Sequence, residues 1–259
     1  PNYVSYTDKP ELDAARRDFT VNALFYSPSQ DTILDFFGGQ DDLKKGILKT
    51  VGNPEKRFSE DYLRILRAIR FIAKLGFTPD PKTVSACAKF ANGLKMISAE
   101  RIRDELNIIL TNKNPDFAFK MMLELGILDV ILPELSAMKN VPQPPDFHPE
   151  GDVFEHTILM LSHIAIPDAE TAWTVLLHDV GKPSTIAFDG DSVPHFYGHE
   201  KTGESICLQI LTRLKFPNKF IERVSSAVSR HMKFSHVEGM KPSKWKRIIA
   251  GDIFPLEME

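Results

Sequence analysis

Four charged side chains recur at even steps in the segment EDYLRILRAIRF, residues 60–71. They are Asp61, Arg64, Arg67 and Arg70, each three positions after the previous one. The apolar residues between them follow a helical period, and on such a helix a step of three turns the side chain back by about 60°. We therefore expect the four charges to form a winding row, led by a carboxylate, opposite the apolar face.

This row has two interpretations. The first is a solvated helix surface with one i,i+3 ion pair, which would stabilise the helix by only about 0.2–0.5 kcal/mol. The second is a site that reads a nucleobase. Adenine and cytosine present an amino donor beside a ring-nitrogen acceptor, so Asp61 could accept from the amine while Arg64 donates to the ring nitrogen. Guanine and uracil present the reverse pattern, and the remaining arginines would suit phosphate groups.

The histidines are confined to one part of the chain, since all eight lie between His148 and His236. A lone histidine in a helix is more often packed or exposed than a ligand, so ordinary packing is one interpretation. The other is a metal site, because a histidine and an aspartate stand side by side at the end of the apolar run AWTVLLHDVG. Nitrogen and carboxylate ligands without cysteine favour an exchangeable ion such as manganese, nickel, iron or magnesium over structural zinc. The candidate ligands are His156, His178, Asp179, His199 and His231.

Composition is that of an ordinary globular protein. The 259 residues are 42% apolar and 26% charged with a net charge of −3, so any basic surface for nucleic acid must be local. Cys87 and Cys207 form no disulfide framework, which indicates a reducing compartment, the cytoplasm. No apolar run approaches the length of a membrane span, so no membrane partner is expected. The chain starts without a methionine, and we expect both ends to be cut from a longer protein.

The elements that must position these residues are mostly helices. Residues 21–37 predict a β-hairpin around the turn-forming cluster SPSQD, and the following GGQDDL predicts a turn. From Ser59, a plausible N-cap, the pattern becomes helical and runs to Gly76, and Ser98 is the expected cap of the next helix. The proline-rich residues 136–152 predict a linker, and further helical segments follow it.

Four motifs occur in an order that resembles the bacterial tRNA nucleotidyltransferase and poly(A) polymerase family, which includes the CCA-adding enzymes. They are RRDFTVNAL, LDFFGGQDDL, EDYLRILRAIRF and RIRDEL. The resemblance implies that Arg17 contacts the incoming nucleotide, that Asp18 helps to hold its sugar, and that Asp61 and Arg64 read the base edge. It places further residues at the same nucleotide, namely Asn22, Arg67 and Arg70.

The histidine region resembles the HD family of metal-dependent phosphohydrolases, whose ligands are a histidine, a His-Asp pair and a later aspartate. His156 matches the first ligand, and His178 with Asp179 matches the pair. His199 and His231 match additional histidines found near the metal in many members.

Four more residues have a less certain relation to this metal site. The later aspartate could be Asp252 or lie beyond the end of the chain. His148, His195 and Lys182 could surround the pocket, although the surface is the favoured place for them.

Together the resemblances imply a mixed, mostly α fold. We expect the C-terminal part of an α/β nucleotidyltransferase palm in residues 1–43 and a helical neck and body in 44–135, which read the nucleotide and bind RNA. A linker in 136–149 and an all-α HD domain in 150–259 complete the chain. The family's metal-binding carboxylates do not occur between Pro1 and Asp13, so no catalytic residue of nucleotidyl transfer is expected in this chain, and its Mg²⁺ ligands are expected upstream.

The implied activity is the addition of C and A to the 3′ end of tRNA from CTP and ATP, with a second, phosphohydrolase activity in the HD domain. One alternative is a poly(A) polymerase, which would use ATP on another RNA 3′ end. Another is a metal-dependent phosphohydrolase whose front half binds RNA, and a third is an RNA-binding module without catalysis. The motifs accept adenine whether or not cytosine is also used, so they leave these alternatives open.

Overall fold

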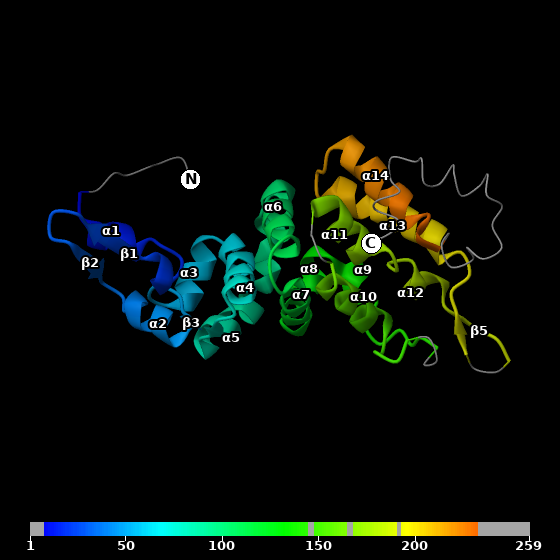
Figure 1. The fold of residues 1–259 in the computed structure, drawn as a ribbon, viewed down its shortest axis with the longest axis horizontal. Helices are drawn as coiled ribbons and strands as arrows, with labels where there is room; N and C mark the ends of the chain where they lie inside the picture. Colours follow the sequence, from blue (N-terminus) through cyan, green and yellow to red (C-terminus); the bar gives the residue numbers. More distant parts are fainter. Residues whose placement is uncertain (1–7, 145–147, 165–167, 191–192, 233–259) are drawn as a thin grey trace.

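The computed structural model describes residues 8–144, 148–164, 168–190 and 193–232. Figure 1 shows an elongated, mostly helical molecule whose elements follow one another along its length, from a β-hairpin at one end to packed helices at the other. This agrees with the mixed, mostly α fold that the sequence predicts. No helix in these ranges is both long enough and apolar enough to cross a membrane.

The N-terminal part combines short helices with a hairpin. Its elements are α1 (Pro10–Ala15), the 3-10 turn η1 (Thr20–Asn22), β1 (Leu24–Ser27), β2 (Thr32–Asp35), α2 (Gly39–Lys45) and β3 (Ile47–Leu48). Strands β1 and β2 pair antiparallel, from Leu24 opposite Asp35 to Ser27 opposite Thr32. This register confirms the predicted hairpin.

The GGQDDL segment forms the helix α2 and not the expected turn. Asp35 accepts hydrogen bonds from the backbone N–H groups of Gly39 and Gln40, both at 2.9 Å, and so supplies partners for the helix start. Gly38 precedes the helix with a left-handed φ of 76°. A Cβ on Gly39 would lie 2.2 Å from the carbonyl oxygen of Thr20, so only glycine lets α2 approach η1 this closely.

The middle part is a stack of helices. Its elements are α3 (Pro54–Glu60), α4 (Leu63–Leu75), β4 (Thr78–Pro79), α5 (Pro81–Phe90), η2 (Ala91–Met96), α6 (Ala99–Leu110), α7 (Pro115–Glu124), α8 (Leu128–Ile131) and α9 (Pro133–Ser136). Strand β4 pairs parallel with β3. Helix α4 ends at Gly76, as predicted, with a φ of 66°. Ser98 stands at the N-cap of α6, although its hydroxyl makes no capping hydrogen bond.

The helix predicted to start at Ser59 is interrupted at Asp61. Helix α3 begins after Asn53, and Ser59 lies inside it, with its hydroxyl donating to the carbonyl of Lys56. Asp61 is extended, with φ −155° and ψ 105°, and its Oδ1 accepts from the N–H of Leu63 at the start of α4. The single winding row of four charges is therefore wrong, because the aspartate lies outside the helix that carries the three arginines.

The C-terminal part is again helical. Its elements are α10 (Val153–Ser162), α11 (Ala169–Leu177), α12 (Lys182–Thr185), β5 (Ala187–Phe188), β6 (Pro194–His195), α13 (His199–Arg213) and α14 (Asn218–Val228). Strands β5 and β6 form a short antiparallel hairpin. Helix α14 packs against both α13 and α11.

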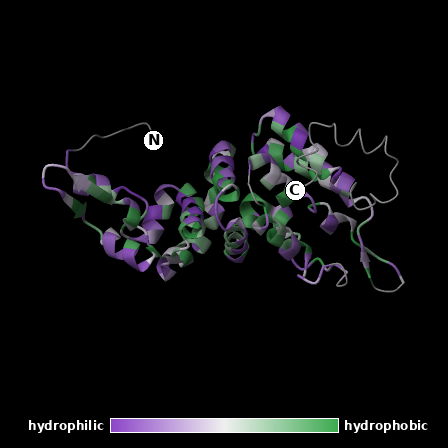
Figure 2. Ribbon diagram, in the orientation of Figure 1, coloured by the Kyte–Doolittle hydropathy of each residue, from purple (hydrophilic) through white to green (hydrophobic). Residues whose placement is uncertain are grey.

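One large hydrophobic core extends from Phe19 and Leu48 of the N-terminal part through the middle part to Val228 of the C-terminal part. Trp173 of α11 is fully buried in it, and its Nε1 donates to Oδ1 of Asn107 on α6 at 2.7 Å. Met138, in the segment predicted as a linker, is also fully buried. Hydrophobic residues, green in Figure 2, occupy helices of both parts. The connection therefore packs against the body, while the domain boundaries given above stay a prediction.

Candidate nucleotide-binding and metal-binding sites

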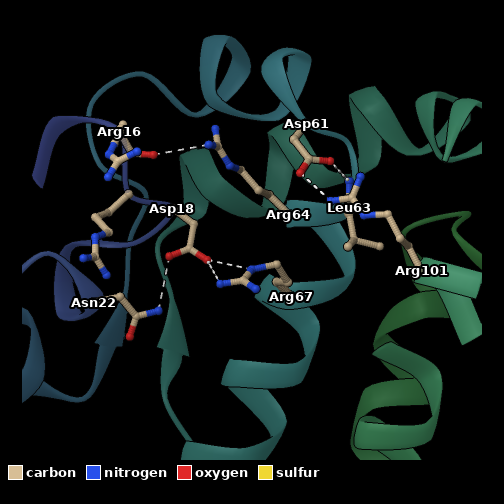
Figure 3. Close-up of a pocket in the computed structure, with 9 residues that line it drawn as sticks. Arg16, Asp18, Asn22, Asp61, Leu63, Arg64, Arg67 and Arg101 are labelled. Carbon is tan, nitrogen blue, oxygen red and sulfur yellow. Dashed lines mark hydrogen bonds and ion pairs between the residues drawn. The ribbon is translucent and has the colours of Figure 1, made fainter. Parts of the chain in front are cut away.

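A pocket of about 410 Å³ opens between the loop after α1 and the N-terminal ends of α4 and α6 (Figure 3). It is lined by Arg16, Arg17, Asp18, Asn22, Asp61, Leu63, Arg64, Arg67 and Arg101. Six of the seven residues predicted to bind a nucleotide are thus in one place. Five arginines against two aspartates make the lining strongly basic, although the whole chain is acidic. Such a lining suits a phosphorylated ligand.

The inner wall is fixed by Asp18, which is buried. Arg67 on α4 donates to Asp18 Oδ2 from Nε at 2.8 Å and from Nη2 at 2.6 Å. The second carboxylate oxygen accepts from Nδ2 of Asn22 at 3.2 Å and from the N–H of Phe19 at 2.9 Å. These four hydrogen bonds hold the Asp18 carboxylate in one orientation, and they draw the loop after α1 against α4.

The outer rim carries Arg17, whose side chain is 46% exposed. Its Nη2 lies 2.9 Å from Oδ2 of Asp13, and its guanidinium lies 5.4 Å from the ring centre of Phe25. Hydrogen bonds from Arg17 and from Arg16 lower the pKa of Asp13. Arg17 therefore places an exposed cationic side chain beside the pocket, held by Asp13 and the ring of Phe25.

Asp61 and Arg64 both line the pocket but do not pair in the expected way. Oδ2 of Asp61 accepts from Nη2 of Arg101 at 2.7 Å. Arg64 turns toward α3: its Nη1 donates to Oε2 of Glu60 at 2.8 Å and to the carbonyl of Arg57 at 2.9 Å. The physical reason is the break at Asp61, which removes the carboxylate from the helical face that Arg64 occupies.

Arg70 does not line this pocket, and its contact with a nucleotide stays a prediction. Its Nε lies 2.8 Å from Oε2 of Glu105 on α6, and its guanidinium lies 4.6 Å from the ring centre of Phe71. Burial raises the pKa of Glu105, and the charges of Arg70 and Arg67 oppose that shift. This cluster ties α4 to α6 below the pocket.

Sequence reasoning missed three lining residues, Arg16, Leu63 and Arg101. All three stand inside motifs already recognised, Arg16 in RRDFTVNAL, Leu63 in EDYLRILRAIRF and Arg101 in RIRDEL. The charge of the two arginines was a signal available in the sequence, whereas Leu63, an apolar residue at the start of an amphipathic helix, is expected in the core.

The second site surrounds Asp179, which is 2% exposed at the end of α11. His178 Nε2 lies 3.1 Å and His156 Nε2 lies 3.9 Å from Oδ2 of Asp179. His199 Nε2 lies 3.5 Å and His231 Nε2 lies 3.7 Å from Oδ1. The structure therefore brings together all five residues predicted as metal ligands, from four separate segments of chain.

The opposite ring nitrogens of these histidines are all occupied. Nδ1 of His178, His199 and His231 lies 2.7–2.8 Å from the backbone carbonyl three residues earlier. A carbonyl only accepts, so Nδ1 carries the proton and Nε2 of each neutral ring keeps its lone pair. The Nε2 atoms of His199 and His231 are 3.1 Å apart, and a cation between them would satisfy both. Ligands held through their second nitrogen are typical of metal sites.

Glu150 and Lys182 complete the surroundings of these ligands. Oε1 of Glu150 lies 2.5 Å from Nδ1 of His156 and 3.1 Å from Nδ1 of His148, an interaction that the sequence analysis missed. Lys182 is buried, with Nζ 2.7 Å from Oδ2 of Asp179, so the expectation of a surface position is wrong for it. Burial acts to raise the pKa of Asp179, but His178 and Lys182 hold it well below its usual value.

Two further residues were considered for this site, His195 and Asp252. His195 lies in β6 with Nε2 3.3 Å from Oδ2 of Asp189, and its ring stacks on that of Tyr197. Asp252, the candidate for the last ligand, lies outside the described residues.

Three family models match the chain. The Poly A polymerase head domain matches residues 1–49, the probable RNA- and SrmB-binding site of polymerase A matches 76–139, and the HD domain matches 153–250.

Curated relatives and solved structures agree with these matches. The A-adding tRNA nucleotidyltransferase of Deinococcus radiodurans is 38% identical over 241 residues, which are 89% of this chain and 54% of that protein. The multifunctional CCA protein of Neisseria gonorrhoeae is 37% identical over 238 residues, 89% and 56% of the two chains. The crystal structure of the Bacillus stearothermophilus CCA-adding enzyme in complex with CTP superposes with a TM-score of 0.67 at 25% identity, over 95% of this chain and 53% of that one.

The chain spans about half the length of the curated relatives that it matches. Within that span the head, RNA-binding and HD regions occur in one order. Of the motifs around the arginine-lined pocket, RRDFTVNAL lies in the head match and RIRDEL in the RNA-binding match, while EDYLRILRAIRF lies between the two matches. On these grounds the chain is similar, region by region and in the same order, to the tRNA nucleotidyltransferase and poly(A) polymerase family, with a match to the HD domain after the match to its RNA-binding region.

Proposed function

We propose that this chain is the nucleotide-reading and RNA-binding part of an enzyme that adds C and A to the 3′ end of tRNA from CTP and ATP. The observation that carries the proposal is the basic pocket, in which six of the predicted nucleotide-binding residues meet. Its arginines would neutralise the triphosphate, while Asp18 and Asp61 offer acceptors for the sugar and the base. Transfer itself would use Mg²⁺ held by carboxylates outside the described residues.

Nucleotide incorporation by the whole protein tests this proposal. Three purified tRNA acceptors would be offered to it, ending before CCA, after the first C, and after CC, each with a single labelled nucleotide. Addition of C and then A supports CCA addition. Addition of A without any addition of C would match the name of the Deinococcus relative, an A-adding tRNA nucleotidyltransferase. Long A tails on unrelated RNA would identify a poly(A) polymerase, and no incorporation at all would contradict nucleotidyl transfer.

We propose a second activity, metal-dependent hydrolysis of a phosphoester, in the HD domain. Its support is the convergence of four Nε2 atoms on the buried carboxylate of Asp179. These residues fit a divalent ion such as manganese, nickel, iron or magnesium, which would supply an activated water as nucleophile. Elemental analysis of the purified protein, together with hydrolysis of a generic phosphodiester before and after chelation, tests it. Both activities fit a cytoplasmic enzyme.

A further inference from the structure

Two hollows meet at the loop between α6 and α7. The first, of about 450 Å³, lies between the C-terminal end of α4, the short strand β4 and the start of α7. The second, of about 360 Å³, lies between the same loop and the C-terminal end of α10. Asn114 lines both of them, and α7, which begins beside it, packs against both α4 and α10 (Figure 1). We call the two hollows together the α6–α7 groove.

The groove is separate from the nucleotide pocket. None of the residues that line the groove also lines that pocket. The first hollow is at the C-terminal end of α4 and the nucleotide pocket is at its N-terminal end, and the 13 residues of this helix span about 20 Å. A ligand in the groove is therefore distinct from the nucleotide in the pocket.

Apolar side chains line each hollow. Phe77 and Phe117 contribute to the first, and Leu161 and Ile164 contribute to the second. Phe117 is 48% exposed, although the helix that carries it also contributes to the hydrophobic core. An exposed ring in the wall of a hollow offers a surface on which a planar ligand such as a nucleobase can stack.

The polar side chains of the groove present hydrogen-bond acceptors. Nδ2 of Asn112 donates to the carbonyl of Ile108 at 2.9 Å. Nδ2 of Asn114 donates to the carbonyl of Ala73, also at 2.9 Å. These bonds fix the two amides, whose Oδ1 atoms accept no hydrogen bond in the described part of the chain, and the carboxylate of Asp116 accepts none there either. The groove therefore suits a ligand that carries N–H donors.

Two exposed lysines accompany these acceptors. Lys113 lines the second hollow and directly precedes Asn114, where the hollows meet. Lys74 lies in the last turn of α4, two residues before Gly76, which lines the first hollow. Among the residues that the structure describes, neither lysine forms an ion pair. An unpaired cation between two stacking surfaces suits the phosphate that joins two nucleotides.

We propose that the α6–α7 groove binds an unpaired stretch of RNA, with one base in each hollow and the intervening phosphate at Lys113. The inference rests on the proposed RNA-binding function and adds to it a place and a chemical class. Bases stack on the apolar walls, and the amino groups of adenine, cytosine and guanine donate to Asp116 and to the asparagine Oδ1 atoms. Uracil has no amino group, so it should bind less tightly.

Position and base pairing both favour this occupant. Residues 76–79 and 111–117, which provide most of the lining, lie in the region matched by the RNA-binding model, residues 76–139. In a duplex the bases are stacked on one another and their Watson–Crick edges are paired, so the walls and the acceptors of the groove would gain no partner. An unpaired stretch can supply both the ring faces and the amino groups.

Binding of fluorescently labelled oligonucleotides to the whole protein, followed by anisotropy, tests the inference. Oligo-A and oligo-U of about ten nucleotides are within the usual span of single-strand sites. Phe117→Ala should weaken the binding of oligo-A by about 5- to 150-fold, the range for the loss of one base stack. Phe188→Ala is the matched control, because Phe188 is also an exposed phenylalanine but lies in β5, outside the groove. Phe117→Leu, which keeps an apolar side chain without the ring, gives the same comparison if the alanine variant is unstable.

Two further variants test the phosphate contact and the base contact separately. Lys113→Gln should reduce the slope of log K against log salt by about 0.7, the value for one phosphate of a single strand. Lys89→Gln is its control and should keep the slope, because Lys89 already pairs with Glu55. Asp116→Asn should reduce the preference for oligo-A over oligo-U, because a neutral oxygen accepts a hydrogen bond less strongly than a carboxylate.

The outcomes separate this inference from the proposed function. Weaker binding of oligo-A by Phe117→Ala but not by Phe188→Ala supports the groove, and an equal loss in both, or in neither, would overturn it. An equal loss for a duplex of the same length would overturn the recognition of unpaired bases. Competition by tRNA and by an unstructured RNA shows which of the two supplies the stretch. The groove variants should keep the wild-type affinities for ATP and CTP, and a wild type that binds no nucleotide would contradict the proposed function alone.

Discussion

Arg67 and Asp18 lie 49 positions apart in the sequence and form the most tightly connected ion pair of the nucleotide pocket. Two N–H groups of the guanidinium converge on one carboxylate oxygen, at 2.6 and 2.8 Å, and the aspartate is buried. The pair joins the loop after α1 to α4. The shape of the pocket therefore depends on a contact that also supports the fold.

Arg67→Ala should lower both stability and nucleotide affinity. The change leaves the buried Asp18 carboxylate without its cationic partner, at a cost of about 1–3 kcal/mol in the free energy of unfolding. The loss of stability should be no larger than this because the Arg67 side chain is 36% exposed, so solvent already screens part of the ion pair. Urea unfolding of the variant and of Lys44→Ala, an exposed control on α2, measures the difference. A loss below about 0.5 kcal/mol, the range of ordinary surface changes, would show that the pair does not hold the loop.

Arg17→Ala should weaken nucleotide binding and leave the free energy of unfolding almost unchanged. The Arg17 side chain is 46% exposed, and its partners Asp13 and Phe25 belong to the same N-terminal part, so the free energy of unfolding should stay within about 0.5 kcal/mol of the wild type. The affinities for ATP and CTP should fall together, because a contact to sugar or phosphate does not distinguish bases. Nucleotide titration and urea unfolding of the same preparation give both quantities. An unfolded variant would mean that the arginine is structural.

Glu105 should make the free energy of unfolding decrease as the pH rises. Burial raises its pKa, so the folded protein binds this proton more tightly than the unfolded chain does. Its contribution to the free energy of unfolding is therefore greatest below the ordinary glutamate pKa of about 4.3 and decreases as the pH rises through the raised native pKa. Urea unfolding from about pH 4 upward should show this decrease in the wild type.

Glu105→Gln provides the comparison. The amide cannot titrate, so the decrease assigned to Glu105 should be absent from the variant. Loss of the ion pair with Arg70 should shift stability at every pH, which makes the slope and not the absolute value the quantity to compare. Identical slopes for the two proteins would remove Glu105 as the cause.

Asp179→Ala should abolish metal retention and phosphoester hydrolysis and leave nucleotide addition by the whole protein intact. The change removes the carboxylate on which the histidines converge. Asp189→Ala is a suitable control, because Asp189 is exposed and pairs with His195. Elemental analysis after reconstitution with manganese or nickel compares the two variants with the wild type. Equal metal content in wild type and Asp179→Ala would exclude Asp179 as a ligand.

The stability of Asp179→Ala must be followed in the same experiment. Lys182 would keep a buried ammonium without its carboxylate partner, so the variant should unfold at a lower urea concentration. Asp179→Asn keeps the volume and one acceptor oxygen, and it should lose metal with a smaller loss of stability. A metal-free but folded Asp179→Asn protein would separate ligation from folding.

The sequence predicted the hairpin and most of the helices. The structure also brings together six of the seven residues predicted to bind a nucleotide and all five predicted as metal ligands, whose roles stay predictions. The sequence allowed these predictions because the motifs carry both the local pattern and the chemistry. The histidines were recognisable from the His178–Asp179 pair, and the structure adds how their second nitrogens are held. That part was not predictable, since the backbone carbonyl partners carry no side-chain signal.

The wrong predictions of secondary structure arose where local backbone conformation and hydrogen bonds departed from the periodic sequence pattern. Residues 54–75 have continuous helical periodicity, but the extended backbone at Asp61 breaks the helix in two. Periodicity alone does not reveal such a break, because the apolar positions of the two helices remain nearly in phase. The partner of Asp61 could not be predicted either, because Arg101 lies 40 positions away on another helix and only the folded chain brings the two together. The α2 helix was missed because its start depends on the Asp35 side chain and a left-handed glycine.

Helix α6 has a consequence for how this protein could change over evolution. On one side it presents Arg101 and Glu105 to the nucleotide pocket and to α4, and on the other Asn107 receives the hydrogen bond of the buried Trp173. A recombination event that exchanged the HD domain for another would have to reproduce the surface that covers this tryptophan. The two proposed activities are therefore expected to be inherited as a unit, and a chimaera joined at the proline-rich connection should fold only if both parents share the residues that meet α6.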